Sequence, residues 1–292
     1  MEYTIHNSFL TVTINTAGAQ VQSIRNASGE EMCWCADPKI WNRHAPILFP
    51  YVGWLRKGTY QLDGKTYEGK SHGFARDSQF TVQDVQDTSI TFRLMYNEDT
   101  LKLLPRKFCL DITYSLDGAA LRQTTTVKNL DDRELRFGLG YHPGYTLPFD
   151  DKHKTSDYEL RFDTPQTPEV VVFDDALMTH ESHTYMENSA AIPLDDRMFD
   201  NDSIFLRGLH AKTVSIVEKD TGRAITMDLE GFPYFVFWSA MHQEHLHFLC
   251  LEPWHSHPDF VDADGDWNHK PCAAQLAPGE NFTSHLNVTF RR

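Results

Sequence analysis

The chain has 292 residues, of which 40% are hydrophobic and 23% are charged, as in ordinary soluble globular proteins. Its formal net charge of −14 at pH 7 argues against nucleic acid or an anionic membrane surface as the main partner, but not against a small neutral ligand. No apolar run approaches the ~20 residues of a membrane helix, no secretory start is present, and five cysteines without framework spacing predict free thiols in a reducing cytoplasm.

Regular alternation of apolar and polar residues is the main secondary-structure signal in this sequence, and it predicts strands. Residues 9–15, 89–96 and 110–116 each place their apolar side chains on one face. The Asp-Gly pairs at 63–64 and 117–118 predict tight hairpins, because glycine accepts a positive φ without steric cost. Further strands are expected at YELRF, SIFLR, VSIVE, AITMDLE, YFVFW, HFLCLE and HLNVTF.

Helical periodicity is scarce. Residues 98–105 and 172–178 are each expected to form a turn or two of helix, and the more polar stretch 150–200 predicts long loops. Many short strands separated by frequent turn signals indicate an all-β, mainly antiparallel fold, a large β-sandwich with few short helices. Because the sequence has no internal repeat, low-complexity segment or Pro/Gly-rich linker, we expect a single domain over residues 1–292.

Two histidines stand at sharp turns of the chain. In GKSHGFARDSQF, His72 precedes a glycine, and Arg76 follows with Asp77 directly behind it. In FGLGYHPGYTLP, the Pro-Gly pair after His142 forces a turn that holds the imidazole ring at a strand end. Taken alone, each segment also fits a loop histidine, and the Arg-Asp pair also fits a structural salt bridge.

The segment HFLCLEPWHSH, residues 247–257, has one carboxylate, Glu252, at the end of an apolar run. Burying a carboxylate without partners is costly, so its neighbours must hydrogen-bond it or raise its pKa, and both outcomes suit a general base. Pro253 lacks an N–H group, which predicts that the strand gives way to a loop here. The alternative is a glutamate that caps an adjacent loop.

A metal site is a second interpretation of the same region. The order His245-x-His247 followed by Glu252 matches the first metal motif of cupins, and such ligands bind Zn, Mn or Fe. However, no glycine stands at the usual distance before His245 or after Glu252. Alternation along a strand also places the two histidines on one face and Glu252 on the other. We therefore expect no metal site in this segment.

Taken together, these three segments resemble those of the aldose 1-epimerase (mutarotase) family. The resemblance spans nearly the whole chain, from TAGAQVQSIRNASGEEMCW through PILFPYVGWLRKGTYQLDGKTY, SHGFARD, GYHPGY and LCLEPW to LAPGENFTSHLNVTF. The short forms HGFARD and LCLEPW are most similar to the bacterial branch that includes lactose-operon-associated members. The order and spacing of the motifs carry the resemblance, since no single motif is diagnostic.

The resemblance implies a galactose mutarotase-like supersandwich with the sugar site in an open cleft on one sheet. It assigns the general base to Glu252, the general acid to His142 and a second, hydrogen-bonding histidine to His72. Asp202 matches an aspartate that binds sugar hydroxyl groups in several members. The implied reaction interconverts the α and β anomers of a free aldose, such as galactose, with no cofactor and no metal.

The sequence departs from the family pattern after the glycine of PYVGW. Many relatives carry arginine there, where this chain has Trp54, and Arg56 follows two positions later. A shift of two keeps the same strand face, so either Arg56 replaces that arginine or Trp54 stacks on the sugar. Arg76 is a further candidate for substrate binding. The other aromatic candidates for stacking on the sugar ring are Trp254, Tyr141 and Trp238.

Two other functions remain open. The same chemistry could act on a hexose 6-phosphate, with Arg56, Arg76 or Arg43 as phosphate contacts, although the negative net charge disfavours this. The same scaffold could also serve a non-catalytic carbohydrate-binding protein. In each case we expect a small-molecule sugar as the ligand, no nucleic-acid or membrane partner, and a monomer or homodimer.

Overall fold

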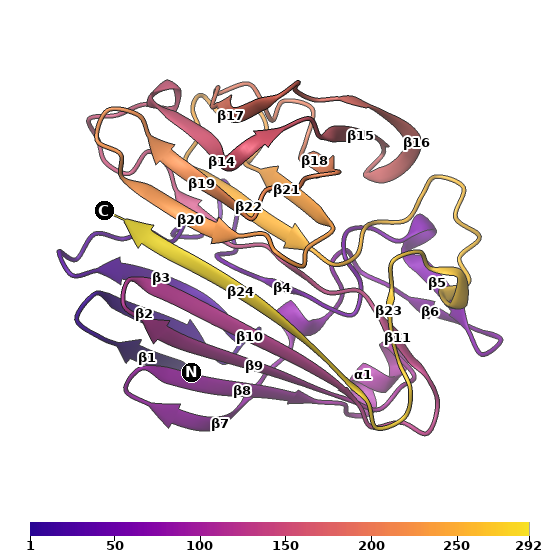
Figure 1. Ribbon diagram of the computed structural model, residues 1–292. Helices are drawn as coiled ribbons and strands as arrows, with labels where there is room; N and C mark the ends of the chain where they lie inside the picture. The colour runs from indigo at the N-terminus through magenta and orange to yellow at the C-terminus, as the bar shows by residue number, and fades with distance from the viewer. Residues whose placement is uncertain (292) are drawn as a thin grey trace.

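The computed structural model describes residues 1–291. Within them, most strands lie in two large antiparallel sheets, which a three-stranded sheet and short strand pairs complete (Figure 1). The expected all-β, mainly antiparallel β-sandwich with few short helices is confirmed. None of the helices in residues 1–291 has the length and apolarity needed to span a membrane.

The larger sheet, in the described part of the chain, contains nine strands in the order β17–β14–β19–β20–β24–β10–β9–β8–β7. The long strand β24 lies between β20 and β10 and joins the two halves of this sheet (Figure 1). The strands are β7 (Thr81–Gln86), β8 (Ser89–Met95), β9 (Phe108–Asp117), β10 (Ala120–Asn129), β14 (Tyr158–Gln166), β17 (Ser189–Pro193), β19 (Thr213–Glu218), β20 (Ala224–Asp228) and β24 (Asn281–Arg291).

The second large sheet, here called the site sheet, has the order β16–β15–β18–β21–β22–β12–β4, with β13 also paired with β22. Its strands are β4 (Ile47–Leu48), β12 (Gly140–Tyr141), β13 (Gly144–Thr146), β15 (Glu169–Asp174), β16 (Leu177–Thr184), β18 (Ile204–Arg207), β21 (Tyr234–Trp238) and β22 (Phe248–Trp254).

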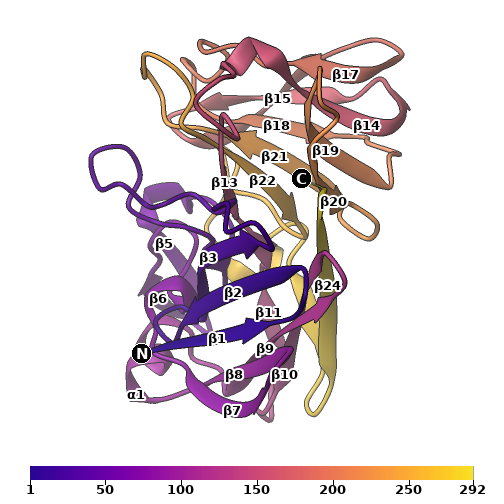
Figure 2. The same ribbon diagram turned by 90° about the vertical axis from the view of Figure 1, so that its left-hand side faces the viewer.

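Smaller elements complete the fold. The sheet β1–β2–β3 lies against the β8–β10 part of the larger sheet (Figure 2), where the Tyr3 ring contacts Phe92 and the Tyr114 hydroxyl donates to the Ala19 carbonyl. Helix α1 begins with a capping box at Asn97. These elements are β1 (Glu2–His6), β2 (Leu10–Asn15), β3 (Gln20–Asn26), β5 (Thr59–Leu62), β6 (Lys65–Glu68), β11 (Leu135–Phe137), β23 (Ala274–Leu276), α1 (Glu98–Leu103) and the 3-10 helices η1 (Arg56–Gly58), η2 (Ala75–Asp77), η3 (Thr155–Asp157) and η4 (Trp267–His269).

The main core lies between the apolar faces of the two large sheets. Phe162 of β14 contacts Phe235 of β21, and Tyr145 of β13 contacts Phe290 of β24. All four belong to one continuous cluster of buried apolar side chains. The strands predicted from alternation correspond to β2, β8 and β9, and both predicted Asp-Gly hairpins are confirmed as β5–β6 and β9–β10.

Two predictions from the middle of the chain are wrong. Residues 172–178 form a hairpin, the end of β15 and the start of β16, instead of a helical turn. Asp175 and Ala176 at its tip have φ values of 46° and 62°, which a right-handed helix does not allow. The stretch 150–200 is also not mainly loop, because it contains β14, β15, β16 and β17.

Strand β22 lies inside the site sheet, between β21 on one side and β12 with β13 on the other, and all of its residues are buried. Pro253 does not end this strand, contrary to the prediction. The N–H groups of Leu251 and His255 both donate toward the β12–β13 segment, and Pro253 lies midway between them. Its missing donor therefore faces Tyr141 at the end of β12, where the pairing of β22 with β12 stops.

Candidate active site

A cavity of about 330 Å³ opens on the site sheet above β21 and β22. Segments far apart in the sequence supply its walls, including the loop after β4, the turn before η2, and the tip of the β15–β16 hairpin. Most of the predicted site residues meet here. They are Glu252, His142, His72, Arg76, Asp202, Trp54, Trp238 and Trp254.

Glu252 and His142 face each other across neighbouring strands. The register of β22 with β12 and β13 places residue 142 opposite residue 252, in the interruption between β12 and β13. His142 Nε2 lies 3.3 Å from Glu252 Oε2. Two distant motifs of the sequence thus form one acid–base pair on the cavity floor.

Three rings fix the orientation of the His142 imidazole. Trp41 stacks on it with ring centroids 4.9 Å apart, and Trp238 and His72 meet it edge-on at 5.7 and 5.6 Å. His142 is 9% exposed and Glu252 is 1% exposed. The packing therefore buries most of the pair and holds the imidazole beside the carboxylate.

Burial also sets the proton affinity of the pair. Burial raises the pKa of Glu252 well above its usual range, and the Asp202 carboxylate raises it further. The Trp254 indole lowers this pKa and so partly opposes both effects. Burial lowers the pKa of His142 to about 3, and nearby guanidinium groups add to the fall. Both shifts disfavour a charge on either group in the sugar-free cavity.

Four buried polar atoms of residues that line the cavity have no hydrogen-bond partner within the described residues. They are Arg76 Nε, His142 Nδ1, Glu252 Oε2 and Trp254 Nε1. A buried polar atom without a partner costs about 1–3 kcal/mol. A ligand that carries hydroxyl groups would supply the missing partners, so the site is suited to a polyhydroxylated molecule.

His72 is held as a neutral hydrogen-bond donor. Its Nδ1 accepts a hydrogen bond from the Gly53 N–H group at 3.1 Å, which leaves the ring proton on Nε2. Burial, the neighbouring His142 and nearby guanidinium groups lower the pKa of His72 well below its usual range. His72 and Gly73 have φ values of 62° and 73°, so a left-handed turn presents the ring to the cavity.

Sequence and structure both relate this chain to known proteins. The family model described as aldose 1-epimerase matches residues 1–289. The chain belongs to the aldose 1-epimerase family. The resemblance inferred from the motifs is thereby confirmed over nearly the whole chain.

Individual relatives of this epimerase-family chain agree with the assignment. It is 34% identical to a galactose mutarotase related enzyme from Lactobacillus acidophilus, with 100% of this chain and 98% of that chain covered and a TM-score of 0.95. A galactose mutarotase-like protein from Lactobacillus casei gives 31% identity, 100% coverage of both chains and a TM-score of 0.93. The chain is also 29% identical to the chromosomal protein LacX of Lactococcus lactis subsp. lactis, over 99% of each chain. The galactose mutarotase-like fold is therefore confirmed.

Two predicted site residues of this aldose 1-epimerase homologue do not line the cavity. Arg56 begins the 3-10 helix η1, where strand parity does not apply, and its guanidinium donates to the Ala263 carbonyl at 3.0 Å. Tyr141 directly precedes His142, so its ring points to the opposite face of the strand, into the sandwich core. Arg56 therefore does not replace the arginine of many relatives, and Trp54, which is 50% exposed at the cavity, occupies that position instead.

Several residues of the cavity carried no clear signal in the sequence. Trp41, which stacks on His142, lies in an irregular segment before β4. Phe173 reaches the cavity from the β15–β16 hairpin, and Met241 comes from the turn after β21. Only Gly53, which bonds to His72, belongs to a segment that the motif comparison singled out. The other three depend on tertiary packing.

The histidines that suggested a cupin-like metal motif lie outside this cavity lining. His245 and His247 precede β22 and contact each other, with ring centroids 4.2 Å apart. The predicted separation of these two histidines from Glu252 agrees with this arrangement. The structure does not bring the three side chains together as one ligand set.

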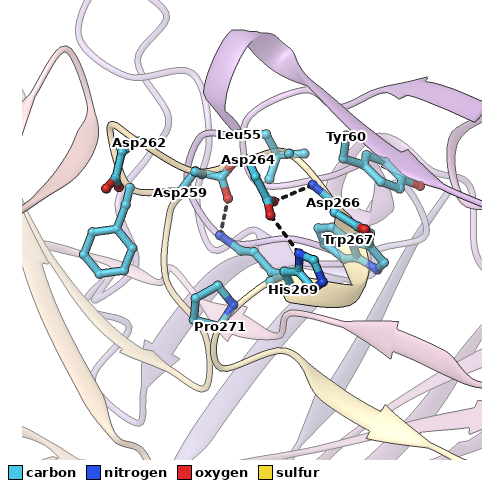
Figure 3. Close-up of a pocket in the computed structure, with 13 residues that line it drawn as sticks. Leu55, Tyr60, Asp259, Asp262, Asp264, Asp266, Trp267, His269 and Pro271 are labelled. Atoms are coloured by element: carbon cyan, nitrogen blue, oxygen red, sulfur yellow. Dashed lines mark hydrogen bonds and ion pairs between the residues drawn. The ribbon is translucent and has the colours of Figure 1, made fainter.

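A second cavity, of about 270 Å³, lies along the loop that follows β22 (Figure 3). Its carboxylates already have partners: Lys270 Nζ donates to Asp259 at 2.6 Å, and His269 Nδ1 lies 2.7 Å from Asp264. The Asp259 N–H group also donates to the Trp54 carbonyl at 2.9 Å. The loop therefore supports the backbone of Trp54 at the rim of the first cavity.

Acidification is expected to destabilise the fold between pH 6.5 and about 4. Burial lowers the pKa of His255 and of His257 to about 4, from 6.5 in the unfolded chain. The unfolded chain therefore binds more protons in this window, and the free energy of unfolding falls as the pH falls. Each histidine contributes on the order of 3 kcal/mol, present in full above pH 6.5 and lost by about pH 4. Urea unfolding midpoints across this range measure the effect.

A matched pair of variants makes this prediction specific. His257→Gln should make the midpoint less dependent on pH, because one buried titrating ring is removed, whereas exposed His183→Gln should not. A midpoint that stays constant between pH 6.5 and about 4 in the unmodified protein would contradict the prediction.

Proposed function

We propose that this protein is an aldose 1-epimerase that interconverts the α and β anomers of a free aldose by acid–base ring opening. The strongest support is the buried Glu252–His142 pair, whose Oε2 and Nε2 atoms lie 3.3 Å apart on the cavity floor. The cavity volume of about 330 Å³ falls within the range of small-molecule sites.

Ring opening needs one proton acceptor and one proton donor. Glu252, as the base, removes the proton from the anomeric hydroxyl group, while His142, as the acid, donates a proton to the ring oxygen. The bond between C1 and the ring oxygen breaks, and the former anomeric hydroxyl becomes the aldehyde carbonyl. Rotation about C1–C2 and reclosure give the other anomer. Reclosure returns Glu252 and His142 to their starting number of protons, so the reaction consumes no cofactor.

The proton must be on His142 when this reaction begins. In the sugar-free cavity the pKa shifts favour its position on Glu252. Sugar hydroxyl groups that hydrogen-bond the carboxylate stabilise its charged form, so substrate binding favours transfer of the proton to His142. The Nε2–H group of His72 is placed to donate to a sugar oxygen, since its Nδ1 is already engaged.

The remaining side chains suit a sugar in complementary ways. Asp202 and Arg76 offer an acceptor and a donor to hydroxyl groups. Trp254 and Trp54 offer apolar ring faces to the C–H groups of the sugar. Polar recognition and stacking are thus available within one cavity.

The charges at the cavity favour a neutral sugar over a hexose 6-phosphate. Arg76 lines the cavity, but Arg56 bonds elsewhere and Arg43 already pairs with a carboxylate at 2.8 Å. Asp202 brings a carboxylate to the cavity, and its negative charge would repel a phosphate group.

Polarimetry on freshly dissolved α-D-glucose, α-D-galactose and α-D-glucose 6-phosphate tests the activity and the substrate class. We expect acceleration of mutarotation in proportion to protein concentration, with kcat/KM at least about tenfold higher for a free sugar. A higher value for the phosphorylated sugar would assign that substrate. Sugar binding by calorimetry, without acceleration for any of the three, would indicate a non-catalytic carbohydrate-binding protein.

A further inference from the structure

Cys250 adds a third metal-ligating side chain to the catalytic pair. It precedes Glu252 by two residues in β22, so both side chains lie on the same face of the strand. The Cys250 sulfur, a Glu252 carboxylate oxygen and a His142 ring nitrogen all lie within 4.8 Å of one another. The ring-opening reaction uses the carboxylate and the imidazole but leaves the thiol without a role.

The thiol is buried beneath the cavity and is protonated at neutral pH. Cys250 is fully buried and belongs to a small apolar cluster with Trp34 and Phe248. Burial, the Glu252 carboxylate and Cys33 raise the pKa of Cys250 well above its usual range. Such a thiol reacts poorly with oxidants, because the thiolate is the reactive species. A metal ion can still replace its proton, since metal binding stabilises the thiolate.

The geometry suits a tetrahedral ion. Thiolate, imidazole and carboxylate are zinc ligands, and three protein ligands leave one position open. Two atoms bound to zinc at about 2.0–2.1 Å in tetrahedral geometry lie about 3.4 Å apart. His142 Nε2 and Glu252 Oε2 lie 3.3 Å apart and already have this spacing. The thiol sulfur needs to approach the other two atoms by about 1.3 Å at most to complete the set.

A separate observation also indicates a ligand at this place. Oε2 of Glu252 is buried, and although His142 Nε2 lies 3.3 Å away, the contact lacks hydrogen-bond geometry and leaves this oxygen without a hydrogen-bond partner among the described residues. The Asp202 carboxylate lies near enough to add to the negative potential at Glu252. A divalent cation would satisfy the unpartnered oxygen and gain from both charges.

We propose that His142, Cys250 and Glu252 bind a thiophilic divalent cation of the zinc class, which inhibits the enzyme by occupying its catalytic pair. Binding releases protons, because the thiolate and the carboxylate are the forms that bind the metal. The inhibition rests on the function proposed above, whereas binding of the metal does not. Mg²⁺, which prefers oxygen ligands and octahedral geometry, does not compete.

Cd²⁺ is the probe for binding, because its bond to a thiolate gives ultraviolet charge-transfer absorption. The exposed thiols Cys35 and Cys272 are first replaced by serine, so that only buried cysteines remain. In this background, one equivalent of Cd²⁺ is expected to produce the absorption, and Cys250→Ser or Cys250→Ala to abolish it. Cys33→Ser replaces another buried thiol and should retain it.

Zn²⁺ added to metal-free protein is expected to suppress mutarotation, and EDTA to restore it. Cys250→Ser should keep the basal rate but need about 10–100-fold more Zn²⁺ for the same inhibition, because one ligand is lost. Equal zinc sensitivity in both proteins, or cadmium absorption that persists without Cys250, would overturn the proposal. Cadmium absorption that depends on Cys250, in a protein without mutarotase activity, would keep the metal site and refute the proposed function.

Discussion

Glu252→Gln is expected to reduce mutarotase activity by about 10²–10⁴-fold. Glutamine keeps the shape of the side chain but cannot take the proton of the anomeric hydroxyl group. Burial disfavours the charge of Glu252 in the folded protein, so the variant is expected to melt at the same temperature or higher. Lost activity with retained stability identifies a catalytic group and excludes a purely structural role.

Polarimetry and thermal unfolding of the same preparations measure both effects. Glu244→Gln is the matched control, because it makes the same chemical change at an exposed position just before β22. It should leave both the rate and the melting temperature unchanged. A folded Glu252→Gln protein with the unmodified rate would remove this carboxylate from the mechanism.

Gly73→Ala is expected to destabilise the fold by about 4 kcal/mol or more. Gly73 has a φ of 73°, and a Cβ atom added there would lie 2.1 Å from the carbonyl oxygen of Phe49. That oxygen accepts from the Phe74 N–H group at 3.0 Å, so moving it away breaks a backbone hydrogen bond. The change would also displace His72. Guanidinium unfolding, or the soluble yield if the variant does not fold, measures the loss.

Gly118→Ala separates backbone conformation from close approach. Gly118 also has a positive φ, 56°, but a Cβ atom added there would meet nothing within 4 Å. Alanine at this position should cost only about 1–2 kcal/mol, the usual penalty of a left-handed residue. A similar loss in both variants would show that the contact with Phe49 is unimportant.

Strands were predictable where their two faces differ in exposure. In β8, buried residues alternate with more exposed ones, and the sequence alternates in the same way. β22 is buried on both faces, so it reads as an apolar run without alternation. Its extent could not be predicted because Pro253 is tolerated where the pairing of β22 with β12 stops, and the sequence does not show where that pairing stops.

The false helical turn at 172–178 has a related cause. Its apolar residues fit a helical spacing, but Asp175 and Ala176 adopt positive φ values as the tip of a hairpin. Neither residue is a glycine, so the usual sequence signal of such a turn is missing. Pairing of β15 with β16 outweighs local preference at this position.

The candidate site was likewise predictable only in part. Family resemblance identified Glu252, His142 and His72, which the structure gathers in one cavity. Residue chemistry alone did not, because the register between distant strands depends on the whole sheet. Arg56 was misplaced because the prediction assumed a strand, in which residues two positions apart share a face, whereas the chain forms η1 here. Trp41 was missed because its stacking on the imidazole depends entirely on tertiary packing.

The most direct test of anomer interconversion is ¹H NMR exchange spectroscopy on galactose at anomeric equilibrium. This experiment measures the transfer of magnetisation between the H1 signals of the α and β anomers while both anomers are present. The unmodified protein is expected to produce exchange cross-peaks that grow with its concentration, and Glu252→Gln to produce almost none. Exchange no faster than in protein-free solution, at a concentration where calorimetry shows bound galactose, would contradict the account.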